Sequence, residues 1–350
     1  MVKHLAFAIP GDLDTPTGGY AYDRRIISEL KDAGWNIDVV NLGDGYPHID
    51  AKAQTEAQAR LSGVPEGRPI VIDGLALGVL PEAAASVQAR NPLIGLVHHP
   101  LALESGLSLG QAEKFRASER AALAHARGVI VPSAATAHVL TTDYGVTADR
   151  ITVACPGTDP VTPADGSLDG IVRLLAVGSL VPRKGYDLLI AALATLKDLP
   201  WRLTIAGDER DRATAEMIKS DIARLQFTDR VTLVGAVSST RLNELYLAAD
   251  VFVLASRYEG YGMAYAEAIA HGLPVIGTRA GAIPDTVPSE AAILVAPEDA
   301  DALAHALHQM IANKNERQRF ASAARAAASR LPTWRSSAAL FAGAIEAATR

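Results

Sequence analysis

Short apolar runs bounded by turn residues recur along the 350-residue chain, six before residue 160 and six after it. Segments with helical spacing separate most of these runs. Runs that are apolar throughout and alternate with helices are typical of parallel sheets covered on both faces. The pattern therefore predicts two doubly wound α/β domains. The candidate strands are HLAFAIPG, NIDVVNLG, PIVIDG, LIGLVHH, GVIVPS and ITVACPG, then VRLLAVGS, RLTIAGD, RVTLVGA, VFVLAS, PVIGTRAG and AAILVAP.

The domain limits follow from local composition. Residues 155–170 are rich in Pro, Gly and Asp and show no periodicity, which predicts the hinge. We expect one domain over residues 1–160 and a second over 161–330. The remaining segment, 331–350, is predicted to be an amphipathic helix that opens at Thr333.

Composition and charge narrow the function classes. With 49% hydrophobic and 21% charged residues, the chain has a soluble globular composition. Cys155 is the single cysteine and the N-terminal apolar run is too short for a signal peptide, so a cytoplasmic protein is expected. Residues 1–165 hold 13 Lys and Arg against 19 Asp and Glu, and residues 166–350 hold 20 of each. Without a broad basic face, nucleic acid is not an expected partner, and small molecules are favoured.

The chemistry is expected where strands end. Open α/β sheets bind ligands outside the carboxyl ends of their strands, so the cleft between two such sheets is the default site. Arg183 and Lys184 follow the strand LLAVGS and lead into a helix. Two cations beside free helix amides suit a diphosphate, although a solvated basic loop has the same sequence signal.

Two carboxylates flank a glycine-rich bend in SRYEGYGMAYAEAIAHG, residues 256–272. Glu259 stands at the end of the strand VFVLAS, before glycines that let a ligand approach the backbone closely. Glu267 lies inside the following helix, as its only charge in an apolar segment. The two are therefore predicted to reach different parts of one extended ligand, whereas the alternative is a helix cap and a solvent-facing side chain.

At this point the residues resemble a known family. VGSLVPRKG, IAGD and the stretch from VTLVGA to GAIPDTV are similar to the nucleotide-sugar domain of retaining GT-B glycosyltransferases of family GT4, over most of residues 172–300. The resemblance implies two Rossmann-like domains that face each other across a cleft, with the C-terminal helix crossing back to the first domain. It implies that the first domain binds the acceptor and the second the donor.

The resemblance also implies roles for individual residues. Arg183 and Lys184 would neutralise the donor diphosphate, Glu259 would meet the transferred sugar and Glu267 would bind ribose hydroxyls. Further donor contacts would come from backbone amides and from the base pocket. The amides are those of Gly260, Tyr261, Gly262 and Met263, and the base pocket is formed at Val234 and Gly235.

The first half carries weaker signals. Gly18 and Gly19 in TPTGGY resemble the family's glycine-rich loop, which approaches the donor phosphate, although an ordinary strand-to-helix turn would look the same. In VHHPLALE, His99 is the better match to the family's active-site histidine, and His98 is the alternative. The spacing of Asp12 and Asp14 resembles a metal motif of another glycosyltransferase fold, but nothing nearby completes a coordination set.

The function implied by the resemblance is metal-independent, retaining transfer of a hexosyl unit from a nucleoside-diphosphate sugar, UDP-linked by preference, to an acceptor hydroxyl, without a cofactor. A sugar, a lipid or a small molecule would be the acceptor, and a lipid would bring peripheral contact with the inner face of a membrane. A noncatalytic nucleotide-sugar-binding protein, a GT-B sugar-nucleotide epimerase and an NAD-dependent oxidoreductase remain alternatives. The last would need G-x-G-x-x-G after the first strand, which PGDLDTPTGGY lacks. Oligomeric state is not indicated.

Overall fold

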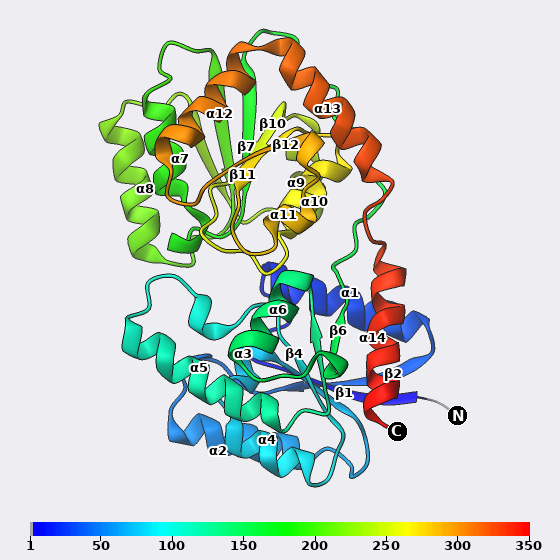
Figure 1. Cartoon of the computed structure of the whole chain (residues 1–350). Coiled ribbons are helices and arrows are strands. Elements are labelled where there is room, and N and C mark those ends of the chain that lie inside the picture. The colour runs from blue at the N-terminus through cyan, green and yellow to red at the C-terminus, as the bar shows by residue number, and fades with distance from the viewer. Residues whose placement is uncertain (1–2) are drawn as a thin grey trace. The chain divides into compact units, whose positions relative to one another are not determined.

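A computed structural model describes residues 3–350, and the chain divides into two compact units (Figure 1). One unit contains residues up to 157 together with 332–350, and the other contains 158–331. The division after Gly157 falls inside the Pro- and Gly-rich stretch 155–170. Each unit holds a six-stranded parallel sheet, so the predicted pair of doubly wound domains is confirmed.

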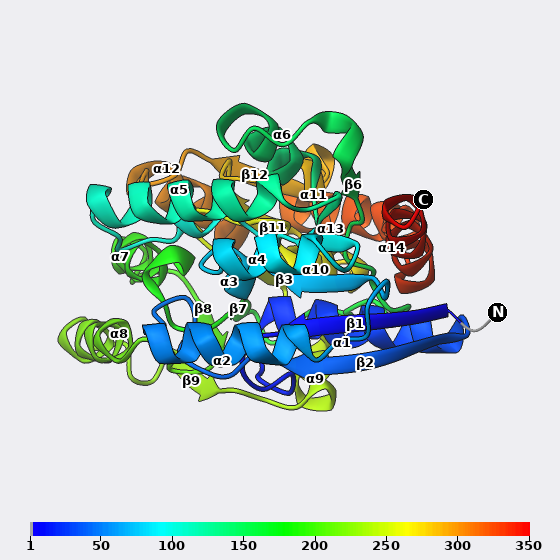
Figure 2. The ribbon, with the colours of Figure 1, turned by 90° about the horizontal axis from the view of Figure 1, so that it is seen from below.

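In the first unit the strand order is β2-β1-β3-β4-β5-β6. All four residues of both β3 and β4 are buried, as expected for central strands that are covered on both faces. At one edge of the sheet, β1 and β2 pair in parallel over seven residues (Figure 2). The strands are β1 (Lys3–Ile9), β2 (Trp35–Asn41), β3 (Ile70–Asp73), β4 (Leu93–Leu96), β5 (Gly128–Val131) and β6 (Ile151–Val153).

The helices of this unit begin at polar capping residues. The Thr17 hydroxyl accepts a hydrogen bond from an amide in the first turn of α1, and Asp50 and Ser133 cap α2 and α6 in the same way. The helices are α1 (Gly18–Asp32), α2 (Ala51–Ser62), α3 (Gly74–Leu77), α4 (Pro81–Gln88), α5 (Leu109–Ala124), α6 (Ala134–Asp143) and α14 (Trp334–Ala348), with 3-10 turns η1 (Leu101–Leu103) and η2 (Ala148–Arg150).

The C-terminal helix α14 completes the first unit, as expected. It begins after Thr333, which forms a capping box with Ser336, and it packs against α1 and β5. The Trp334 ring lies 6.0 Å from that of Tyr22 on α1, and Phe341 stacks on Phe7 of β1 at 6.1 Å. The chain thus leaves this unit and later returns to it.

In the second unit the strand order is β12-β11-β10-β7-β8-β9. The chain order reverses between β7 and β10, and such a switch point opens a crevice at the carboxyl ends of the two strands. The strands are β7 (Val172–Val177), β8 (Trp201–Ala206), β9 (Val231–Gly235), β10 (Val251–Val253), β11 (Val275–Thr278) and β12 (Ala292–Val295).

The helices of the second unit cover a continuous apolar core that includes Trp201, Phe252 and Tyr265. They are α7 (Tyr186–Ala194), α8 (Arg212–Arg224), α9 (Ser239–Leu247), α10 (Met263–Ala270), α11 (Ile283–Thr286), α12 (Ala300–Ala312) and α13 (Lys314–Ala328), with 3-10 turns η3 (Pro182–Lys184) and η4 (Ser289–Ala291). Among residues 3–350, no helix has both the length and the apolar character that a membrane crossing requires.

Candidate active site

The loops that follow β7 and β10 meet at the switch point of the second unit. After β7 the chain forms the turn η3, which carries Arg183 and Lys184 and ends at Gly185 with φ at 66°. A Cβ at Gly185 would lie 2.0 Å from the carbonyl oxygen of Ala255, which follows β10. Only glycine combines this left-handed conformation with so close an approach, so it brings the basic turn against the β10 loop.

The carboxylate of Glu259 lies between the two cations. It accepts hydrogen bonds from Lys184 Nζ at 2.7 Å, from Arg183 Nη1 at 3.3 Å and from the Ser256 hydroxyl at 2.7 Å, and the residue is only 6% exposed. Burial alone would raise the pKa of Glu259, but Lys184 and Arg183 outweigh it and lower the pKa to about 2. The carboxylate is therefore ionised at neutral pH, and the two cations are held beside it.

The backbone around Glu259 is equally constrained. The Ala282 amide donates to the Glu259 carbonyl at 2.9 Å, and a Cβ at Gly281 would lie 2.2 Å from that oxygen. Gly262, with φ at 94°, then leads into α10, whose first amides have no side-chain cap. Gly260, Tyr261 and Met263 belong to the same bend. Uncapped amides at a helix N-terminus favour an anion, so this bend can complement the basic turn.

Glu267 lies within α10 and belongs to a second polar cluster. Its carboxylate accepts a hydrogen bond from the Tyr246 hydroxyl of α9 at 2.9 Å. The Tyr246 ring stacks on His271 at 4.7 Å, and His271 Nε2 lies 2.9 Å from the side-chain oxygen of Asn243. Burial raises the pKa of Glu267 to about 7, although the bond from Tyr246 lowers it. A carboxyl with this pKa titrates near neutral pH, and a ligand hydroxyl that donates a hydrogen bond to it would favour its ionised form.

Val234 and Gly235 lie elsewhere on the same sheet. They end β9, the edge strand, which is separated from β7 by β8. Gly235 has φ at 69° and its carbonyl accepts from the Gly207 amide at 2.9 Å. They share the carboxyl edge of the sheet with the basic turn, and their assignment to a base pocket stays a prediction.

In the first unit the glycine-rich loop meets a histidine. Gly18 and Gly19 are the first residues of α1, and a Cβ at Gly19 would lie 3.3 Å from His98 Cδ2. His98 follows β4, and its Nε2 lies 3.1 Å from Asp23 Oδ1 and 3.2 Å from Asp73 Oδ2. The structure thus gathers the glycine loop, one imidazole and two carboxylates at the carboxyl ends of neighbouring strands.

His99 has different surroundings. Its Nε2 lies 3.3 Å from Glu104 Oε2, in the turn that follows η1, and its side chain is 25% exposed. The choice of His99 over His98 stays a prediction, but the residue that contacts Gly19 is His98. Asp12 and Asp14 form a local turn, in which Asp12 Oδ1 accepts from the Asp14 amide at 2.9 Å.

Sequence reasoning missed several polar residues of these clusters. Asp73 carried a signal, because a charged residue at the end of the apolar run IVID lies at the edge where ligands bind. Asp23 and Tyr246 carried none, since each is a polar residue within a helix whose partner is far away in the sequence. Ser256, which donates to Glu259, was part of the quoted bend without being singled out.

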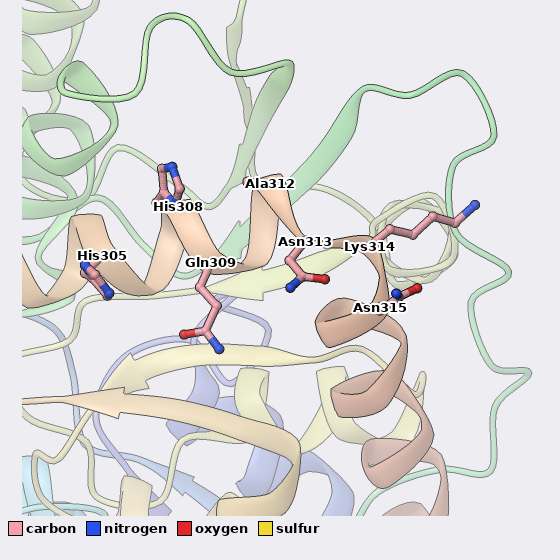
Figure 3. Close-up of a pocket in the computed structure, with 7 residues that line it drawn as sticks. All are labelled: His305, His308, Gln309, Ala312, Asn313, Lys314 and Asn315. Atoms are coloured by element: carbon pink, nitrogen blue, oxygen red, sulfur yellow. The ribbon is translucent and has the colours of Figure 1, made fainter.

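A hollow of about 660 Å³ lies elsewhere, along α12 and the start of α13. Its lining includes His305, His308, Gln309 and Asn313, and none of the residues predicted for the site. The side chains do not converge, since His308 and Gln309 point to opposite sides of α12 (Figure 3). The hollow therefore has no arrangement that suggests chemistry.

Comparison with known proteins identifies relatives of both units. The family model described as "Glycosyl transferases group 1" matches residues 169–327, and the one described as "Glycosyltransferase Family 4" matches residues 74–161. The MMP α-(1→4)-mannosyltransferase of Mycolicibacterium hassiacum is 28% identical over 267 residues, which are 71% of this chain and 63% of that protein. The chain spans less than two thirds of the length of the curated relatives it matches.

Solved structures share the fold over nearly the whole chain. The sucrose-phosphate synthase of Thermosynechococcus elongatus has a TM-score of 0.81 at 22% identity, and the match covers 97% of this chain and 98% of that one. Anabaena Alr3699/HepE, solved in complex with UDP and glucose, has a TM-score of 0.74 at 18% identity, covering 97% and 99%. At these identities the likeness shows the fold.

Proposed function

Because the chain belongs to the family-4 glycosyltransferases of GT-B fold, we propose that it transfers a hexosyl unit from a nucleoside-diphosphate sugar to an acceptor hydroxyl, with retention of configuration and without a metal. A UDP-linked sugar is the proposed donor. The observation that carries the proposal is the pairing of the partly buried Arg183 and Lys184 with the buried Glu259 at the switch point of the second unit.

The first role in the proposal is to bind the diphosphate. Arg183 and Lys184 are held in place by Glu259 before a ligand arrives, so little side-chain freedom is lost on binding. The amides at the start of α10, after Gly262, add donors without a net charge. Negative charge that develops on the leaving diphosphate is stabilised by these groups, which need not rearrange.

The second role is to orient the donor. Glu259 meets hydroxyls of the transferred sugar, and Glu267 binds the ribose hydroxyls. Retention is proposed to follow a front-face route, in which the leaving phosphate accepts the proton of the acceptor hydroxyl. Glu259 is a poor nucleophile in this setting, because its carboxylate is already hydrogen-bonded to Lys184, Arg183 and Ser256.

The acceptor is proposed to be a sugar or a small phosphorylated molecule. The names of two relatives, mannosylfructose-phosphate synthase and D-inositol 3-phosphate glycosyltransferase, support this class. A lipid acceptor would place the reaction at the inner face of a membrane, and a free sugar would place it in the cytoplasm.

The proposal is tested by ligand-induced thermal shifts with UDP, GDP, ADP and NAD. A ligand at a hundred times its dissociation constant stabilises the folded protein by about 2.7 kcal/mol. We expect one nucleoside diphosphate to raise the melting temperature of the wild type, but not that of Arg183→Ala or Lys184→Gln. The matched control is Arg212→Ala, which removes an exposed cation of the same unit and should leave the shift intact.

The readout is the shift on adding ligand, since either variant also leaves Glu259 with fewer partners and lowers the starting melting temperature. A donor sugar of the same nucleotide should then be consumed by the wild type, with turnover about 10²-fold lower in Lys184→Gln. A shift with NAD alone, or no shift with any of the four compounds, would overturn the proposed function.

A further inference from the structure

Three elements of the first unit bring one imidazole between two buried carboxylates. Asp23 comes from the second turn of α1, Asp73 is the last residue of β3, and His98 follows β4. Asp23 and Asp73 are 0% and 3% exposed, while the His98 side chain is 20% exposed. Two buried anions need a compensating cation, and among the described residues His98 is the group whose ring lies within 3.2 Å of both.

The hydrogen bonds determine which proton the ring must carry. Both carboxylates face the same ring atom, Nε2. If Nε2 had no proton, its lone pair would face two anions, which is repulsive. If Nε2 alone had the proton, the ring would still be neutral and would leave two buried charges uncompensated. Protonation of both nitrogens removes the repulsion and compensates one of the two buried charges.

The other groups around the ring do not oppose this. The Tyr22 and His98 rings form a T-shaped pair with centroids 5.4 Å apart, and the Tyr22 hydroxyl donates to the Ala154 carbonyl. Gly19 leaves room for the ring on the loop side. Burial lowers the pKa of His98, but the two carboxylates raise it, and the result is about 10. Burial also raises the pKa of Asp23 to about 6, although His98 lowers it, so the Asp23 carboxylate is still ionised at neutral pH. Burial raises the pKa of the Tyr22 hydroxyl, with smaller contributions from Asp23 and Cys155, so this hydroxyl stays neutral. The neighbouring His99 is paired with Glu104.

The second ring nitrogen remains for a ligand. Among the described residues the structure shows no hydrogen bond from His98 Nδ1, and the side chain is partly exposed. The carboxylates are themselves fixed, since Asp73 Oδ1 accepts from the Leu75 amide at 2.7 Å. Asp23 Oδ2 is buried without a hydrogen-bond partner. Two carboxylates beside one imidazolium leave an excess negative charge, which favours the proton on the ring.

We propose that Asp23 and Asp73 are positioning residues that keep His98 doubly protonated, so that Nδ1–H is a permanent hydrogen-bond donor to an oxygen of a bound ligand. His98 then binds a hydroxyl or phosphate oxygen and does not act as a general base. The protonation state of the His98 ring does not depend on the proposed function. Only the identity of the ligand rests on the proposed function.

The test observes the ring directly. The full chain is labelled with ¹⁵N and ¹³C histidine, His98 is assigned by comparison with His98→Gln, and the ring signals are followed from pH 5 to 9.5 in the presence of EDTA. We expect His98 to stay charged to about pH 9 in the wild type. In Asp73→Asn its pKa should drop by roughly 1 to 3 pH units, because one of two adjacent anions is lost.

The controls separate this effect from folding. Asn at position 73 can still accept the Leu75 amide, so α3 keeps its cap, and Asp23→Asn provides a second, independent variant. The matched control is Glu104→Gln, which removes a carboxylate 3.3 Å from the adjacent His99 and should leave His98 unchanged. A wild-type His98 that titrates near its ordinary value, or that is neutral at pH 7, would overturn the inference.

A divalent cation between the same three residues is the competing occupant. Stoichiometric Zn²⁺ added to the EDTA-treated and desalted protein would then shift the His98 signals, and that outcome would also overturn the inference.

The rate of glycosyl transfer gives an additional readout. The wild-type rate should not fall between pH 7 and 9, whereas that of Asp73→Asn should fall above the lowered pKa. If the signals behave as expected and no transfer is found, the proposed function fails and the inference stands.

Discussion

Replacing Glu259 by glutamine should destabilise the second unit without changing its shape. Glu259 is buried, and its pKa is about 2 instead of the ordinary 4.5 because Lys184 and Arg183 outweigh the effect of burial. A difference of about 2.5 pH units, at about 1.36 kcal/mol each, corresponds to about 3 kcal/mol. Glutamine keeps the size of the side chain but leaves the two cations without their anion, which for buried pairs costs roughly 3–5 kcal/mol.

The pH dependence of this loss has a defined sign. Because the carboxyl has a lower pKa in the folded than in the unfolded state, its stabilisation is fully present above about pH 4.5 and is lost as the pH falls through about 2. The difference in free energy of unfolding between wild type and Glu259→Gln should therefore be constant from pH 7 to about 5. It should be smaller at pH 4 and smaller still at pH 3.

The assay is thermal unfolding followed by circular dichroism. For a unit of this size, 1 kcal/mol corresponds to about 2–4 °C, so we expect the melting temperature to fall by about 6–12 °C at pH 7. Glu290→Gln is the control, since Glu290 forms an exposed pair with Arg330 and should change the melting temperature little. Inorganic pyrophosphate should stabilise Glu259→Gln more than the wild type, because it replaces the missing anion. A fall below 2 °C, or one that does not narrow in acid, would refute the electrostatic reasoning.

Two further substitutions test the other buried carboxyls. Burial raises the pKa of Glu119 to about 8, above its unfolded value, so the wild type loses stability as the pH rises towards 8. Glu119→Gln should therefore raise the melting temperature by several degrees at pH 8.5 and little at pH 5. Equal effects at both pH values would contradict this. Tyr246→Phe removes the hydrogen bond to Glu267 and should raise KM for the donor several-fold with a smaller change in kcat. Initial rates from pH 6 to 8.5 should also show donor binding shifted to higher pH, and an unchanged KM would exclude a role for Tyr246.

The central strands were predictable from the sequence because their side chains are buried on both faces. A run such as VFVLA or PVIG has no polar position to obscure it, and all twelve predicted strands are present among residues 3–350. The capping of α14 by Thr333 was predictable for a different reason, since a cap depends on neighbours within one turn. Such local or uniform patterns need no knowledge of distant contacts.

The partners of the site residues were not predictable in the same way. Asp23 is followed in α1 by two arginines and resembles a surface position, yet it is fully buried because His98, 75 residues away, lies against it. His98 and His99 are adjacent in the sequence, and only the packing shows that the first contacts Gly19 while the second contacts Glu104. The resemblance named Glu259 and Glu267, but not Ser256 and Tyr246, which hold them.

The return of α14 to the first unit determines the order in which the protein can fold during synthesis. Residues 158–331 are continuous in the sequence, so the second unit can form once they have left the ribosome. The N-terminal unit must wait, because its helix α14 packs on α1 and β5 and is translated after the second unit. Domains usually fold in order from the N-terminus. In this chain the half that is made first is completed last, and until then the surface that Phe341 and Ile345 will cover stays exposed to chaperones and proteases.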